Sequence, residues 1–158
     1  MNSTSVLVQA FHDAWSHKWE AFTPVIAGLT QVEADWQHPS YADLEKDEGW
    51  PPNGSILWHI AHMIECSERY IRVITKWDHA TESQPANFDS LNLVYLLARL
   101  QTAHTDLARC VSDIREDRYL TTKSGMTLQE FVLMCARHDT WHAAQIAMGR
   151  RLYAYYKS

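Results

Sequence analysis

Two histidines, His138 and His142, lie four residues apart in the stretch RHDTWHAAQI, which has the pattern of a long helix. Residues i and i+4 of an α-helix point to the same side, about 6 Å apart along the axis. Each neutral imidazole offers a nitrogen lone pair, and zinc accepts such nitrogens at about 2.0–2.1 Å. Burying two imidazoles without partners is costly, and a shared metal ion removes that cost. The pair therefore predicts a metal site that takes a third ligand from elsewhere in the chain.

A second helical pattern offers that ligand. Over residues 55–77 the apolar side chains recur at alternating steps of three and four, as in a helix of a bundle. His59 lies on this seam, whereas His62 lies about 60° to one side of it at 100° per residue. Three neutral nitrogens with one open position are typical of a catalytic metal site rather than a closed structural one. The sequence thus indicates His59, His138 and His142 as metal ligands.

Other residues that could bind a metal have simpler explanations. A single histidine on an apolar face is more often a hydrogen-bonded core residue than a ligand, and we assign His17 and His104 to this structural group. Cys66 and Cys135 fit as small core residues, so we do not expect thiolate ligands.

Helices must position these side chains. The first is predicted over residues 5–32, with Pro24 kinking it or splitting it in two. The connection that follows, residues 33–54, is long for a compact domain, and such loops often form a lid or a rim. Its aromatic side chains that could pack over an opening are Trp36, Tyr41 and Trp50.

Three more helices complete the pattern. The second covers residues 55–77, the third follows a polar connection over residues 78–89, and the fourth carries both histidines of the opening motif on its seam. The predicted N-caps are Asn53 or Ser55, then Asp89 or Ser90, then Thr127, whose TLQE sequence forms a capping box after Gly125. No strand pattern or repeat is found. These patterns predict an all-α fold, a four-helix bundle in a single domain over residues 1–158.

Composition narrows the class of protein. The net charge of −5 argues against nucleic-acid binding, which usually needs a basic face. The N-terminus lacks the basic start and apolar run of a signal peptide, and no apolar run reaches transmembrane length. The three cysteines form no CxxC pair and are interpreted as reduced thiols. We therefore expect a cytoplasmic protein with no membrane or nucleic-acid partner.

Two segments carry a resemblance to a known family. SILWHIAH at residues 55–62 and HDTWHAAQI at residues 138–146 resemble the motifs of the DinB/YfiT-like family of metal-binding four-helix-bundle proteins. In that family a histidine lies early in the second helix, and the fourth helix contains His-x-x-x-His followed by two small residues and Gln. Helix order agrees too, so the resemblance spans nearly the whole chain. It implies a divalent ion such as zinc or nickel on His59, His138 and His142.

The resemblance also implies a range of reactions. The family includes thiol transferases that use low-molecular-weight thiols such as bacillithiol, mycothiol-dependent isomerases, and members described as hydrolases. A divalent ion suits both chemistries, because it lowers the pKa of a bound water or holds a thiol as its thiolate. We therefore predict a metal-dependent thiol S-transferase or hydrolase that acts on a small molecule, with a low-molecular-weight thiol as the co-substrate of a transferase.

His62 and Gln145 are the remaining candidates. Relatives carry an acidic residue three positions after the histidine of the second helix, and His62 occupies that place here. Its role is open between an alternative ligand, a proton shuttle and a partner of a ligand. Gln145 follows His142 by three residues and could orient a ligand, although packing explains it equally well.

Three rival interpretations remain. HDxxH resembles the HExxH of zincin peptidases, but no Asp, Glu, His or Cys follows His142 to complete such a site. A di-iron carboxylate bundle needs two Glu-x-x-His motifs, and the sequence has none. The rival of another class is a non-catalytic metal-binding or dimeric interaction module, in which a fourth protein ligand closes the site. Apolar residues near the C-terminus favour a homodimer, namely Tyr153, Tyr155 and Tyr156.

Overall fold

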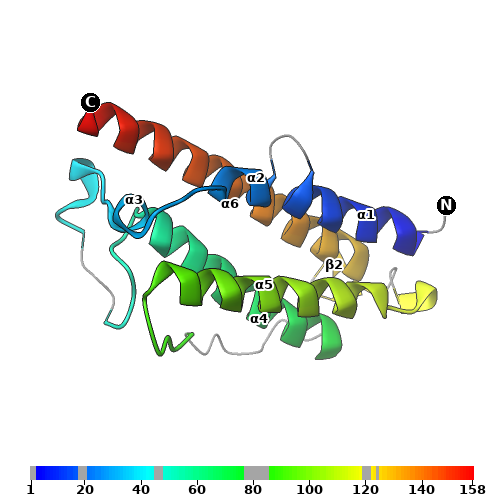
Figure 1. Cartoon of the computed structure of the whole chain (residues 1–158). Coiled ribbons are helices and arrows are strands. Elements are labelled where there is room, and N and C mark those ends of the chain that lie inside the picture. The colour runs from blue at the N-terminus through cyan, green and yellow to red at the C-terminus, as the bar shows by residue number, and fades with distance from the viewer. Residues whose placement is uncertain (1–2, 18–20, 45–47, 77–85, 119–121, 124) are drawn as a thin grey trace.

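Four long helices pack side by side as a bundle in the computed structural model, which describes residues 3–17, 21–44, 48–76, 86–118, 122–123 and 125–158 (Figure 1). They are α1 (Ser3–Ser16), α4 (Ile56–Lys76), α5 (Leu93–Ser112) and α6 (Leu128–Lys157). α5 and α6 each pack against both α1 and α4, so these last two lie diagonally across the bundle. α4 and α5 run in one direction, and α1 and α6 run in the other. The predicted all-α four-helix bundle is confirmed.

The predicted caps of α4 and α6 are confirmed. The Oγ of Ser55 accepts a hydrogen bond of 3.0 Å from the backbone N–H of Trp58, which fixes the first turn of α4. At the start of α6, the N–H of Glu130 donates to Thr127 Oγ1 at 3.2 Å, while the N–H of Thr127 donates to Glu130 Oε2 at 2.8 Å. This reciprocal pair is the capping box.

The predicted cap of α5 is wrong. Asn92, rather than Asp89 or Ser90, precedes the helix, and its Oδ1 accepts from the N–H of Val94 at 2.9 Å. All three residue types cap well, so local preference does not choose among them. The predicted end of the second helix at Trp77, and most of the connection over residues 78–89, lie outside the described residues.

The helix predicted over residues 5–32, kinked or split in two at Pro24, is divided in the structure at other positions. α1 ends at Ser16, and two short helices follow, α2 (Phe22–Ile26) and α3 (Gln31–Asp35). Pro24 lies in the first turn of α2, where its missing N–H has no intrahelical partner to lose. The helical segments are therefore separated before and after α2, and Pro24 itself lies inside a helix. The predicted long connection before α4 remains, and it contains the 3-10 helix η1 (Pro39–Tyr41).

Arg150 of α6 holds this divided segment against the bundle. Its guanidinium donates to Glu33 Oε1 at 2.8 Å and to the backbone oxygens of Val25 and Ala27 at 2.7 and 2.8 Å. One side chain thus connects α6 to the end of α2, the turn after it, and α3.

A small hairpin contradicts the expectation of no strands. Strands β1 (Thr122–Lys123) and β2 (Met126–Thr127) pair antiparallel, and Gly125 turns between them with φ of 78°. Two residues per strand are too few to give a periodic pattern. The hairpin follows the 3-10 helix η2 (Glu116–Arg118) and leads directly into α6.

The core has two halves along the bundle. One gathers Phe11, Leu107 and Phe131 with their neighbours, and the other gathers Ile60, Leu96 and Ile146. α6 contributes Cys135 to the first half and Ile146 to the second, so its two motif histidines fall between the halves. Among the helices of the described residues, none is both long and apolar enough to cross a membrane.

Candidate metal centre and adjoining cavity

Four histidines converge from α4 and α6. His142 lies at the centre, because its Nδ1 is 3.0 Å from Nδ1 of His59 and its Nε2 is 3.1 Å from Nε2 of His138. The ring of His62 is centred 5.1 Å from that of His142 and 5.5 Å from that of His138. The helical spacing of the sequence thus brings all the predicted ligands, and His62 with them, to one place between two helices. We call these four residues the histidine cluster.

The cluster contains a set of nitrogens that fits a metal ion. One ring nitrogen each from His62, His138 and His142 lies within 4.8 Å of the other two. Two nitrogens on a tetrahedral zinc are about 3.3 Å apart, given bonds of about 2.0–2.1 Å. The spacing of 3.1 Å between His138 and His142 is close to that value. His59 approaches the other nitrogen of His142, and a single ion cannot use both nitrogens of one ring.

Burial keeps the cluster uncharged. Burial first, and then the nearby charge of His62, lowers the pKa of His59 and of His138 to about 4. Burial, then the neighbouring histidines, lowers the pKa of His142 to about 2. The pKa of His62 is also lowered, because burial outweighs the opposing effect of Glu65. The rings therefore present neutral lone pairs near pH 7, as metal binding requires.

His62 also contacts residues outside the cluster. Its Nε2 lies 3.4 Å from Cys66 Sγ, its Nδ1 lies 3.6 Å from Glu65 Oε2, and the Trp58 ring is stacked parallel to it at 5.1 Å. Glu65 thus places an acidic group beside His62. Burial raises the pKa of the Cys66 thiol to about 11, so it stays protonated near pH 7. Burial also raises the pKa of Cys135, as expected for a core thiol.

Asp139 and His104 form a buried pair beside the cluster. Asp139 Oδ2 is 3.8 Å from His104 Nε2, and the Trp15 ring is stacked on His104 at 3.7 Å. Burial raises the pKa of Asp139 to about 7 and lowers that of His104 to about 4. A protonated acid beside a neutral imidazole holds the same number of protons as an ion pair, so the pair is neutral overall either way. His104 is in the core, as predicted, whereas His17 is exposed.

Asp139 is a residue whose position the sequence analysis did not use. Asp139 is 3 % exposed, and Asp139 Oδ2, His104 Nε2 and His138 Nδ1 have no hydrogen-bond partner among the described residues. One sequence signal could have indicated that Asp139 is buried: it directly follows His138 on a helix whose neighbouring positions face the core.

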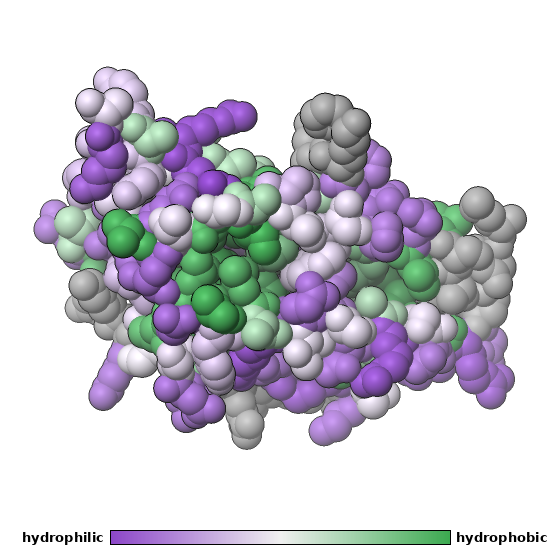
Figure 2. Space-filling model, viewed as in Figure 1, coloured by the Kyte–Doolittle hydropathy of each residue, from purple (hydrophilic) through white to green (hydrophobic). Residues whose placement is uncertain are grey.

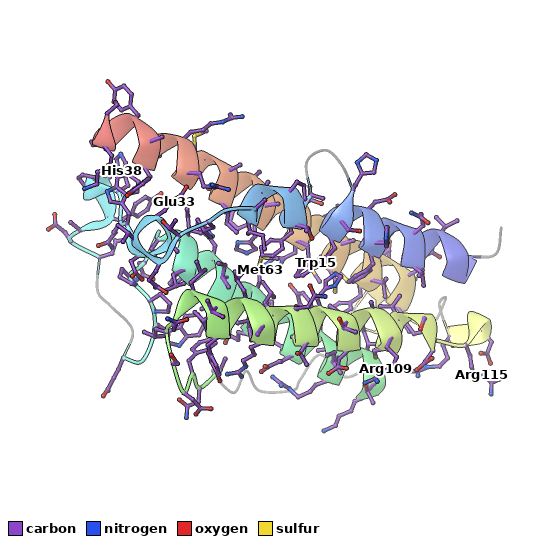
Figure 3. The ribbon with its side chains drawn as sticks, in the orientation of Figure 1. Trp15, Glu33, His38, Met63, Arg109 and Arg115 are labelled. Carbon is purple, nitrogen blue, oxygen red and sulfur yellow. The ribbon has the colours of Figure 1, made fainter. Side chains whose placement is uncertain are left out.

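A cavity of about 420 Å³ adjoins the cluster. His59 is the member of the cluster that lines it, and Trp58 and Trp141 lie on its wall. Trp36 and Tyr41, predicted to pack over an opening, also line it, whereas Trp50 packs edge-on against Phe88 with ring centres 5.2 Å apart. Figure 3 shows that this cavity's His38 lies at the end of the bundle where α6 ends.

A larger groove of about 800 Å³ lies between α1 and the first half of α6. It contains charged side chains, among them Asp13, Glu130 and Arg137, and none of the four cluster histidines lines it. By volume alone this groove would be chosen as the candidate binding site, but the histidine cluster adjoins the smaller cavity.

Fold and site together define a four-helix bundle with a histidine cluster that could bind a metal, held between its second and fourth long helices. A family model described as DinB superfamily matches residues 14–146. The chain therefore belongs to the DinB superfamily, a family of metal-binding proteins, and the resemblance drawn from the two histidine motifs is confirmed. No curated protein and no solved structure matches the chain.

Proposed function

We propose that the protein is a divalent-metal-dependent enzyme of the DinB superfamily that acts on a small molecule, as a thiol S-transferase or a hydrolase. One observation carries this proposal: His59 belongs to the histidine cluster and also lines the adjoining cavity. A small molecule in that cavity would therefore contact the histidine cluster directly. A purely structural metal would need no such opening.

The proposed ligands are His59, His138 and His142, with zinc or nickel as the ion. The geometry of the described residues favours an alternative set in which His62 takes the place of His59, because His59 and His138 face opposite nitrogens of His142. An ion on these nitrogens would supply Lewis acidity that lowers the pKa of a water or of a thiol co-substrate. His142 is fully buried, so the core fixes its ring from every side.

The protein's own residues would handle the proton. His62 is partly exposed and lies 3.6 Å from Glu65, so it can exchange a proton with solvent while the carboxylate orients its ring. Gln145 lines the cavity and can orient a bound molecule through its amide. The three cysteines are free thiols, which agrees with the proposed cytoplasmic location.

Metal analysis tests the site. Purified, untagged protein is incubated with zinc or nickel, dialysed and measured by elemental mass spectrometry, beside the single variants His59→Ala, His62→Ala, His138→Ala and His142→Ala. His12→Ala, at an exposed position of α1, is the matched control. We expect about one ion per folded chain in the wild type and the control. Loss of the ion in His138→Ala and in His142→Ala supports the site. Of the two α4 variants, His59→Ala and His62→Ala, the one that also loses the ion identifies the third ligand.

Activity assays test the enzyme. Metal-loaded protein is screened for thiol transfer to electrophiles and for hydrolysis of small esters and amides, and a ligand variant that folds is the negative control. Activity that the metal restores after chelation supports the proposal. A wild type that binds no ion, or a loaded protein inactive in both screens, favours the non-catalytic module instead. Tyr155 and Tyr156, which are 77 % and 50 % exposed, favour that module because they could form the predicted homodimer interface.

A further inference from the structure

We infer that the cavity beside the histidine cluster binds an uncharged aromatic small molecule, and that this is the substrate class of the proposed enzyme. As a statement about the substrate, this inference rests on the proposed function. As a statement about binding, it rests on the cavity alone.

The charge of the cavity wall is the first argument. Among the described residues that line it, none is Asp, Glu, Lys or Arg. A carboxylate, a phosphate or an ammonium group placed there would lose hydration and would find no oppositely charged side chain. Without a bound metal ion, the described part of the wall therefore selects against ions and favours a neutral ligand.

The aromatic content of the wall is the second argument. Trp36, Tyr41, Trp58 and Trp141 present ring surfaces, and His38 adds a fifth ring edge-on to Trp36 at 5.8 Å. Rings of this kind pair with a flat aromatic ligand by offset stacking or edge-to-face contact. A volume of about 420 Å³ lies within the range of small-molecule sites.

The exposure of these residues is the third argument. Ten large hydrophobic side chains of the described residues are exposed, and four of them line this one cavity: Tyr41, Leu44, Trp141 and Met148. A second apolar area is visible in Figure 2 between α2 and the first half of α5, but nothing in the structure indicates what would cover it. At the cavity, a ligand that covers the four side chains would remove their apolar surface from water.

The wall also connects the ligand to the cluster. Trp58 is stacked on His62, and Trp141 packs edge-on against His142 with ring centres 4.7 Å apart. A molecule stacked on these two indoles would lie next to residues that contact the histidines. Gln145 supplies a neutral donor and acceptor for a polar substituent, and the Nδ1 of His38 already accepts from Ser40 N–H, which leaves its Nε2–H as a donor.

Binding of one aromatic skeleton in three charge states tests the inference. The probes are 2-naphthol, 2-naphthoate and 2-naphthylmethylammonium. Calorimetry near pH 7 measures the dissociation constant of each probe for the full chain. Metal-depleted protein is the decisive sample, because naphthoate could itself bind a metal ion. We expect 2-naphthol to bind at least about tenfold more tightly than either ion.

A charge introduced into the wall shows where the probes bind. Met148→Lys places an ammonium on the cavity wall and should improve naphthoate binding by about tenfold relative to 2-naphthol. Val94→Lys makes a similar change at an exposed position outside the cavity and should leave the preference unchanged. Naphthoate binding as tightly as 2-naphthol to the wild type, no 2-naphthol binding, or the same effect from both lysine variants would overturn the inference. A neutral preference in a chain that binds no metal would refute the proposed function alone and leave the ligand class standing.

Discussion

The contact between Arg150 and Glu33 allows the strongest test of how the fold supports the site. The side chains of Glu33 and Arg150 are 12 % and 28 % exposed, so both are largely removed from water. Replacing Arg150 by Met keeps the apolar stem but leaves Glu33 without its cation. It also leaves the backbone oxygens of Val25 and Ala27 without this donor. We therefore expect a destabilisation well above that of a surface ion pair.

The expected magnitude follows from the burial. Breaking a fully buried ion pair costs about 3–5 kcal/mol, and hydrogen bonds to charged groups contribute about 1.5–3 kcal/mol each. Because part of Arg150 remains exposed, we expect Arg150→Met to lower the free energy of unfolding by about 3 kcal/mol. For a chain of this size that corresponds to a decrease in melting temperature of roughly 6–12 °C.

A double-mutant cycle isolates the pair. Arg150→Met, Glu33→Gln and the double variant are compared by urea denaturation, beside Arg109→Met and Asp106→Asn, a pair at 2.8 Å whose side chains are 71 % and 43 % exposed. We expect a coupling energy of about 2 kcal/mol for the buried pair and under about 1 kcal/mol for the exposed one. A coupling no larger than that of the exposed pair would refute the reasoning from burial.

Three further predictions follow from the same structure. In urea denaturation, Gly54→Ala should destabilise the fold more than Gly125→Ala, by about 1 kcal/mol or more. Both glycines have positive φ, but only at Gly54 would the added Cβ lie 2.7 Å from the Tyr41 ring. Equal losses of stability in the two variants would contradict this explanation. The metal-free protein should lose stability as pH falls from 6.5 toward 4. In the folded protein His59 and His138 have pKa values of about 4, against 6.5 in the unfolded chain, so the unfolded chain binds more protons in this range. A urea midpoint that rises between pH 7 and pH 5 would be inconsistent with neutral buried rings. Saturating zinc should raise the melting temperature and a chelator should reverse the rise, whereas a zinc-independent melting temperature would count against a site in the folded state.

α4 and α6 were predictable because two independent signals agreed in each. Apolar spacing gave the helix and a capping residue gave its start, as at Thr127 for α6. The start of α5 was missed because the choice among capping residues depends on a distant contact. The N–H of Leu93 donates to Gln31 Oε1 at 2.6 Å, across 62 positions of the sequence. Local preference carries no information about such a contact.

The positions at which the first predicted helix divides were not visible in the sequence for a related reason. Ala21 and Val25 fall in phase with the apolar face of α1, so periodicity continues across the break. In the fold, α2 packs against both α1 and α6, and Arg150 binds the backbone oxygen of Val25. These contacts between distant parts of the chain favour separate short helices over one continuous helix.

The histidine cluster shows how much of the site helical spacing alone predicts. His138 and His142 were found because four residues make one helical turn, and a turn leaves little freedom in where two side chains point. His59 and His62 are three residues apart on α4, so both face α6, and helical geometry alone does not separate them. What separates them is ring orientation: His142 directs Nδ1 to His59 and Nε2 toward His138, with His62 completing the compact set. If His59→Ala loses the ion and His62→Ala keeps it, the wall of the cavity supplies the third ligand and the bound molecule faces the metal directly. The opposite result would leave His59 between the ion and the cavity, as the residue that any substrate must contact first.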